Sequence, residues 1–204
     1  HIAEAGEVWR LYTAGACEMD RFYRHFHLHF GNTLKNPNPR LDDALKKCRD
    51  AAEGLYHEWF LKQLTGAWTK AIARDLETLG HVSGIDEQRS FYNRYVSPNV
   101  SRGARVFAVI SDALRYEVAA ELAEALSHNT RGRAALEAVQ AIFPGITRFG
   151  MAALLPGKVI SVNEKMDVFV DGNPTATTVQ RGAVLNAANP ESVAATYKEL
   201  LQMK

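Results

Sequence analysis

The stretch "RVFAVISDALRYEVAAELAEAL", residues 105–126, decides how this sequence folds. Its run "VFAVIS" is short, apolar and rich in β-branched residues, a pattern typical of a strand covered on both faces. A helical stripe follows, with apolar residues at Leu114, Val118, Leu122 and Leu126. Asp112 stands between the two patterns, just after the predicted strand. Open α/β sheets bind ligands beyond the carboxyl ends of their strands, so Asp112 is placed where a ligand would bind.

Further candidate elements follow this stretch. We predict strands over 135–143, 158–162 and 167–172, although the alanines of 135–143 leave a helix open there. A short helix is expected over 149–155 and a final helix over 190–203. Strand–helix–strand order favours an α/β fold with a mostly parallel sheet flanked by helices. We assign residues 101–204 to this domain.

The preceding hundred residues read as helical. Apolar residues recur at helical spacing up to Phe30, Pro37 and Pro39 interrupt the pattern, and a second helical segment covers 41–79, where Gly80 is a stop signal. We expect an α-helical region over residues 1–100, a short helix over 88–96 and a domain boundary near 97–103.

Composition excludes several classes of protein. A net charge of +1 gives no global attraction to nucleic acid or to an anionic membrane. The two cysteines are too few for a disulfide framework and fit a reducing cytoplasm. No apolar run approaches the roughly 20 residues that span a bilayer, and the first residues given do not show the pattern expected of a signal peptide. Both ends fall inside helical patterns, so we expect a fragment of a longer cytoplasmic protein.

Asp112 and Thr147 each have two interpretations from local sequence. Both residue types are common helix N-caps, and both stand where a helix is predicted to begin. The functional alternative makes Asp112 a ligand of a divalent metal ion and Thr147 an exposed nucleophile.

The combination of motifs favours the functional interpretation. "VFAVISDALRYEVAAEL" (106–122), followed by "FPGITRFGMAALLPG" (143–157) and "VFVDG" (168–172), closely resembles the PglZ family, placed in the alkaline phosphatase superfamily and found in BREX-type phage-defence systems. The resemblance covers residues 105–204 well. It implies that Asp112 binds one of two metal ions, Zn or Mn, and that Thr147 is the nucleophile and also contacts the metals.

The sequence departs from that pattern after Thr147. The family's remaining ligands are Asp and His residues, but His128 is the last histidine here and the later acids have no metal-ligand spacing. We therefore expect the missing ligands beyond residue 204. The fragment alone should bind no stable pair of metals and have no useful phosphatase activity.

Some candidates have competing explanations. Arg115 and Arg148 are candidate phosphate contacts, because guanidinium matches phosphate geometry; the alternative is ordinary ion pairing, for example of Arg115 with Glu117. The pair Asp171-Gly172 is most simply a turn, although it could approach the site. His25, His27 and His29 alternate, but a helix splays them apart, which disfavours a metal site.

Two classes of function remain open. The parent protein is either a metal-dependent phosphatase or phosphodiesterase, or a non-catalytic scaffold of a defence complex. Other BREX proteins are the expected partners, DNA an indirect one, and self-association could cover an unpaired sheet edge. A weaker third hypothesis is nucleic-acid binding through Lys46, Lys47 and Arg49.

Overall fold

The computed structural model describes residues 4–35, 38 and 40–202. The predicted break at Pro37 and Pro39 lies outside the described residues. The chain divides into two compact units. Residues 1–84 and 113–138 form the first unit, and residues 85–112 and 139–204 form the second. The predicted boundary near 97–103 remains a prediction.

The first unit is helical, as predicted for most of its length. Its elements are α1 (Ala5–Leu11), η1 (Tyr12–Ala16), α2 (Cys17–Thr33), α3 (Asp42–Glu53), η2 (Gly54–Leu61), α4 (Lys62–Leu79) and α6 (Tyr116–Asn129). The stretches η1 and η2 are π-helical, and the backbone of Gly15 is not helical, which kinks the arm between α1 and α2. Gly80 ends α4 in the left-handed conformation at φ 73°, the stop that the sequence predicted.

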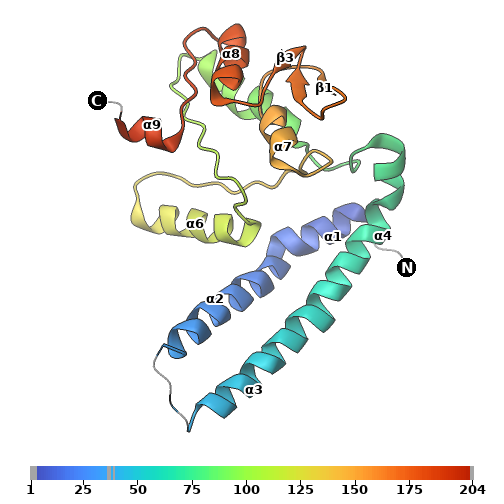
Figure 1. The fold of residues 1–204 in the computed structure, drawn as a ribbon, viewed down its shortest axis with the longest axis vertical. Coiled ribbons are helices and arrows are strands. Elements are labelled where there is room, and N and C mark those ends of the chain that lie inside the picture. Colours follow the sequence, from blue (N-terminus) through green and yellow to red (C-terminus); the bar gives the residue numbers. More distant parts are fainter. Residues whose placement is uncertain (1–3, 36–37, 39, 203–204) are drawn as a thin grey trace. The chain divides into compact units, whose positions relative to one another are not determined.

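Two helical arms of the first unit run side by side (Figure 1): α1 packs against α4, and α2 against η2 and α3. Aromatic contacts join the arms, because Trp9 lies 5.9 Å from Trp68 and Tyr23 stacks on Tyr56 at 3.7 Å between ring centroids. The helix α6 packs against α2. None of the helices in the described part of the chain is both long enough and apolar enough to cross a membrane.

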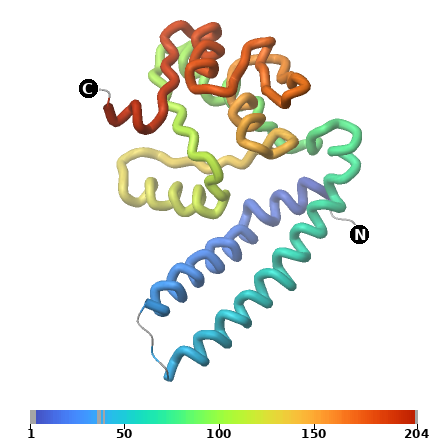
Figure 2. Tube along the Cα trace, viewed as in Figure 1, coloured from blue at the N-terminus to red at the C-terminus, as the bar shows by residue number. Residues whose placement is uncertain are grey.

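The second unit combines short helices with a small sheet. Its elements are η3 (Gln88–Ser90), η4 (Tyr92–Val96), α5 (Ser97–Val100), α7 (Thr147–Ala153), β1 (Ile160–Val162), β2 (Val168–Val170), β3 (Asn173–Pro174), α8 (Thr178–Ala188) and α9 (Tyr197–Gln202). Figure 2 follows this path from α7 through the strands to the carboxyl end.

The core of this unit lies between α7, β2 and α8. Side chains on β2 alternate, so Val168 and Val170 are buried while Phe169 between them is only partly buried. The two valines pack with Phe149, Ala152, Leu155 and Val184. This core holds α7, and with it Thr147, on the β1–β2 hairpin.

The predicted parallel sheet is not what the structure shows. The predicted strands over 158–162 and 167–172 are present as β1 and β2, but they pair antiparallel, and β3 joins β2 antiparallel as well. A turn of only five residues separates β1 from β2, too short for the crossover that a parallel pair needs. The α/β class is therefore only partly confirmed.

The run "VFAVIS" was predicted to be a buried strand, and among the described residues it joins no sheet. Phe107 is 79% exposed and Val109 91% exposed. The run is apolar, as a buried strand would be, but a strand also needs adjacent strands whose backbone groups accept and donate its hydrogen bonds. The segment 135–143 likewise forms no strand, and only Gln140 makes an isolated parallel bridge, to Glu87.

Helix boundaries also differ from the prediction. The helix expected directly after Asp112 begins four residues later, at Tyr116, and the helix expected over 190–203 is limited to α9. The sequence reading missed α8, although Thr177 and Gln180 form a capping box at its start.

Candidate functional site

Asp112 and Thr147 lie in direct contact. The Thr147 hydroxyl Oγ1 donates a hydrogen bond to Asp112 Oδ2 at 3.2 Å, across 35 positions of sequence. The structure brings the two side chains together on an exposed surface. A hydroxyl and a carboxylate are thus adjacent and accessible to a substrate or a metal ion from solvent.

The structure contradicts the alternative in which both residues are helix caps. Arg115 stands at the N-cap of α6, three residues after Asp112. Ile146 stands at the N-cap of α7, and Thr147 is the first residue inside that helix. The Thr147 hydroxyl is therefore directed to Asp112 and not to the backbone of its own helix. The catalytic and metal-binding roles themselves remain predictions.

Arg148, the second residue of α7, contacts main chain. Its guanidinium Nη1 donates to the carbonyl oxygen of Met166 at 3.0 Å, in the turn between β1 and β2. The side chain is exposed, so its remaining N–H groups face solvent. Its role as a phosphate contact remains a prediction.

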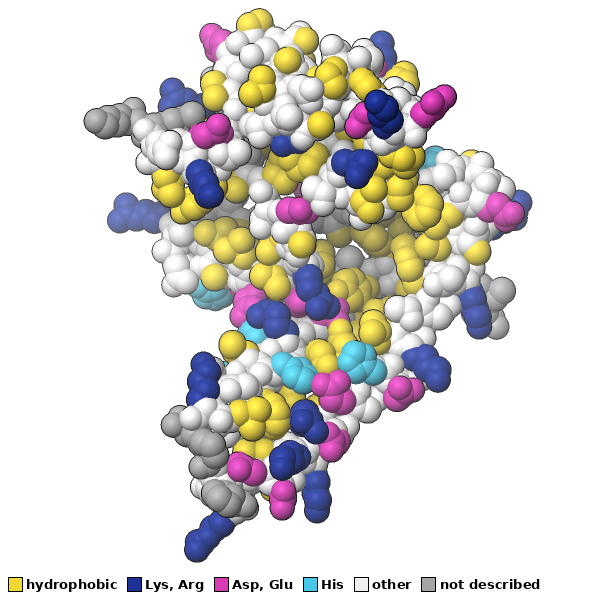
Figure 3. Space-filling model, in the orientation of Figure 1, with side chains coloured by type: hydrophobic (Ala, Val, Ile, Leu, Met, Phe, Trp, Pro, Cys, Tyr) yellow, Lys and Arg dark blue, Asp and Glu magenta, His cyan; other side chains and the backbone are white. Residues whose placement is uncertain are grey.

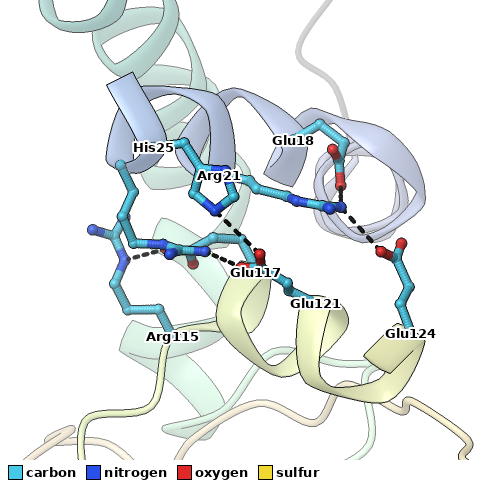
Figure 4. A network of polar contacts seen from close by, with 8 residues as sticks. Glu18, Arg21, His25, Arg115, Glu117, Glu121 and Glu124 are labelled. Carbon is cyan, nitrogen blue, oxygen red and sulfur yellow. Dashed lines mark hydrogen bonds and ion pairs between the residues drawn. The ribbon is translucent and has the colours of Figure 1, made fainter. Parts of the chain in front are cut away.

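Arg115 takes part in ion pairs within the first unit (Figure 4). Its Nε lies 3.3 Å from Glu117 Oε1, and Figure 4 draws these two residues. Its Nη2 lies 3.5 Å from Asp20 Oδ1. The ion pair with Glu117 is the one that the sequence raised as the alternative to a phosphate contact. Arg115 also shares a side-chain hydrogen bond with Tyr56. A role of Arg115 in phosphate binding stays a prediction.

Glu117 is the centre of a charge network between α2 and α6. Its side chain is 0% exposed, yet neither carboxylate oxygen has a hydrogen bond, and its cationic neighbours are Arg115 and, at 3.7 Å, Arg24. Around it, less deeply buried pairs join the same helices: Arg21–Glu124 at 3.2 Å, Arg24–Glu121 at 2.5 Å and His25–Glu121 at 3.1 Å. Charge therefore supplies much of the contact between α2 and α6.

Asp20 is a second buried acid of this network, and the sequence reading missed it. It is 5% exposed and accepts hydrogen bonds from Tyr12 Oη at 2.6 Å and from Tyr56 Oη. Burial and this hydrogen bond raise the pKa of Tyr12 far above its usual range. Its spacing from buried Cys17, one helical turn earlier, was the available signal that it faces inward.

Two of the three alternating histidines lie beside carboxylates in the structure. They lie on α2, where His25 contacts Glu121 of α6 and His27 Nε2 lies 3.0 Å from Glu53 of α3. No group of three or more His, Cys, Asp or Glu side chains is arranged to hold a metal ion within residues 4–35, 38 and 40–202.

The basic residues proposed for nucleic-acid binding have acidic neighbours. Lys46 lies 3.8 Å from Asp43, and Arg49 lies 2.7 Å from Asp50. In Figure 3, basic and acidic side chains are interspersed over this helical arm. The arrangement does not favour a strong attraction to phosphate backbones.

A cavity of about 250 Å³ lies beside α7 in the second unit. Phe149, Ile142, Ile160 and Val170 give it an apolar wall, and Arg89 and Lys158 stand at its polar part. Neither Asp112 nor Thr147 lines it, so the cavity and the exposed contact are separate features.

Comparison with known proteins identifies the family. Residues 91–204, more than half of the chain, match the family described as the BREX system PglZ alkaline phosphatase-like domain. The chain belongs to the PglZ family. The resemblance noted from the motifs is thereby confirmed.

Two curated relatives extend the similarity to the helical part. The PglZ-family chain is 32% identical over 197 residues to the alkaline phosphatase-like protein PglZ of Bacillus cereus (strain H3081.97), covering 97% of this chain and 22% of the relative. It is 30% identical over 209 residues to the alkaline phosphatase-like protein BrxZ of Escherichia coli O9:H4 (strain HS), covering 100% of this chain and 24% of the relative. The chain thus spans about a quarter of the length of these relatives. No solved structure matches it.

Proposed function

We propose that this chain supplies the nucleophile and one metal ligand of a phosphoric-ester hydrolase of a BREX system. The contact between Thr147 Oγ1 and Asp112 Oδ2 carries the proposal, because it places an exposed hydroxyl beside an exposed carboxylate. Membership of an alkaline phosphatase-like family supports it. The relatives are about four times as long as the matched stretch, so the activity is proposed for a protein of their length.

The two side chains suit a divalent cation such as Zn or Mn. They present a carboxylate oxygen and a hydroxyl oxygen 3.2 Å apart, both of them donors that such ions accept. A metal bound there would lower the pKa of the hydroxyl and neutralise charge on a phosphoryl group. Thr147 would attack phosphorus through Oγ1 and expel the alcohol, and water would then hydrolyse the phosphothreonine. Asp112 would hold the hydroxyl in place.

A non-catalytic scaffold within the defence complex is the second candidate. The large exposed apolar side chains of residues 106–110 favour it, since contiguous exposed apolar surface is typical of interaction sites. Its expected partners are other BREX-system proteins. Under this alternative, the Thr147 hydroxyl would be dispensable.

Hydrolysis by the natural-length protein tests the proposal. Chromogenic phosphomonoester and phosphodiester substrates would be offered with added Zn or Mn. Thr147→Val removes the hydroxyl at constant shape, and Thr147→Ser retains it. We expect Thr147→Val and Asp112→Asn to lower kcat by on the order of 10³-fold or more, the size of effect that follows loss of a nucleophile in other hydrolases, while Thr147→Ser keeps substantial activity.

Asp43→Asn, a change of an exposed acid on α3, is the control and should leave kcat unchanged. Activity that survives both Thr147→Val and Asp112→Asn would remove these residues from the mechanism. A wild-type protein that hydrolyses neither substrate, but assembles with the defence complex regardless of Thr147→Val, would establish the scaffold.

A further inference from the structure

The first turn of α7 is fixed to the β1–β2 hairpin by the residue after Thr147. Arg148 Nη1 donates to the Met166 carbonyl at 3.0 Å. Successive residues of a helix project about 100° apart around its axis. A tether at Arg148 therefore fixes the rotation of the helix, and with it the direction in which Thr147 projects.

The turn that receives Arg148 is itself rigid. Asn163 Oδ1 accepts hydrogen bonds from the backbone N–H groups of Lys165 and Asp167, at 3.0 and 2.9 Å. The backbone of Met166 donates to the Asn163 carbonyl at 2.9 Å. Met166 has φ 62°, the left-handed region, which few residues with a β-carbon adopt. A turn closed in this way presents its carbonyl at a fixed place.

Asp171 fixes the loop that leaves α7. Its carboxylate accepts hydrogen bonds from the backbone N–H of Lys158 at 3.1 Å and of Val159 at 2.8 Å. Asp171 also lies in the left-handed region, at φ 46°. The loop fits closely, because a β-carbon at Gly157 would lie 2.2 Å from Val170 Cγ1. The pair Asp171-Gly172 is thus more than a simple turn.

We propose that Arg148 and Asp171 are positioning residues: Arg148 holds the first turn of α7 on the β1–β2 hairpin, and Asp171 holds the segment between α7 and β1, so that the Thr147 hydroxyl meets Asp112. The inference rests on the proposed function for its catalytic meaning. An attacking hydroxyl misplaced by about 1 Å can lose 10²-fold in rate, so such tethers matter to a nucleophile. In this role Arg148 acts through Thr147 and touches no phosphate.

Nuclear magnetic resonance of the isotope-labelled 204-residue chain, free of metal, tests the geometry directly. The readout is the nuclear Overhauser cross-peak between the Thr147 methyl group and the Asp112 β-protons. Arg148→Met removes the first tether, and Asp171→Ala removes the second. Asp171→Asn is the conservative variant, since asparagine tolerates positive φ and keeps an oxygen that accepts from Val159.

Arg181→Met is a matched control. Arg181 also donates to main-chain carbonyls, those of Thr175 and Ala176 at 3.0 and 3.2 Å, but these tie α8 and not α7. We expect the cross-peak to disappear in Arg148→Met and in Asp171→Ala. It should persist in Asp171→Asn and in Arg181→Met.

A cross-peak that survives in Arg148→Met, with far-UV circular dichroism unchanged, overturns the proposal. So does a shift of the Arg148 side-chain resonances on addition of inorganic phosphate, with Arg181 unmoved, because Arg148 would then be a phosphate ligand. Arg148→Met keeps the test decisive if Asp171→Ala fails to fold. The readout needs neither metal nor turnover, so failure of the hydrolase proposal leaves this result distinct.

Discussion

Replacing Arg115 by methionine should destabilise the first unit strongly, although Arg115 itself is 56% exposed. The change strands Glu117, whose side chain is 0% exposed, with Arg24 at 3.7 Å as its remaining cationic neighbour. Asp20, a second carboxylate beside Arg115, keeps its hydrogen bonds from Tyr12 and Tyr56. The loss of stability therefore arises mainly from the buried Glu117 carboxylate, which loses the nearer of its two cationic neighbours.

The expected loss of stability follows from the exposed fractions of the Glu117 and Arg115 side chains. Breaking a buried ion pair by removing one partner costs about 3–5 kcal/mol. Because Arg115 is partly solvated, we expect the lower end, about 3 kcal/mol. Glu117→Met is different: it removes a carboxylate without hydrogen bonds and leaves two arginines that can turn to water, so its effect should stay within about 1 kcal/mol.

Urea unfolding followed by tryptophan fluorescence measures the stability of the first unit. All three tryptophans, Trp9, Trp59 and Trp68, lie within residues 1–84, so the signal reports the first unit. With a slope of about 2 kcal/mol per M of urea, 3 kcal/mol lowers the midpoint by about 1.5 M. Arg49→Met, which breaks an exposed pair with Asp50, is the control and should cost less than about 1 kcal/mol.

The double variant decides whether Glu117 is the cause. In the Glu117→Met background, Arg115→Met should cost less than about 1 kcal/mol, because no buried carboxylate is then abandoned. An equal cost of Arg115→Met in both backgrounds would refute the reasoning. So would a single Arg115→Met that behaves like the Arg49 control.

Two further predictions concern other parts of the chain. Gly157→Ala should destabilise the second unit by about 1–3 kcal/mol, since the new β-carbon would lie 2.2 Å from Val170 Cγ1. Gly145→Ala is the control, because the space around Gly145 is open. Equal protection of the β2 amides from hydrogen exchange in both variants would contradict the close fit. Alkaline pH should destabilise the first unit, because burial and the hydrogen bond to Glu53 raise the pKa of Tyr23 to about 12. An unfolded tyrosine titrates near pH ~10, so this stability is fully present below pH ~10 and is lost as pH rises towards 12; a urea midpoint of the fluorescence signal that stays constant across that range would show otherwise.

The periodicity of apolar residues predicted those helices and strands that depend mainly on contacts between residues close in sequence. The helical arms, the stop at Gly80 and the positions of β1 and β2 all follow from periodicity and from single residues. The antiparallel pairing was also within reach of the sequence, because only four residues, 163–166, separate the two predicted strands, too few for the crossover that a parallel pair needs. The apolar run at 106–111 was misread for a different reason: its composition says nothing about whether a neighbouring strand is available.

The contact between Asp112 and Thr147 could be predicted only by resemblance. The two residues are 35 positions apart, and each alone reads as a helix cap. The tethers of Arg148 and Asp171 had no sequence signal, since their acceptors and donors are backbone groups. The buried state of Glu117 was equally hidden, because Arg24, its partner on α2, lies in a different segment of the chain.

The exposed run "VFAVIS" also has a consequence for handling the protein. Windows of five to seven apolar, β-prone residues without proline are prone to intermolecular aggregation, and flanking charges act as gatekeepers against it. Here those flanking charges are Arg105 and Asp112. Asp112 therefore helps to keep the chain dispersed, and a variant that removes its charge should be compared with wild type only after light scattering shows that both are monodisperse.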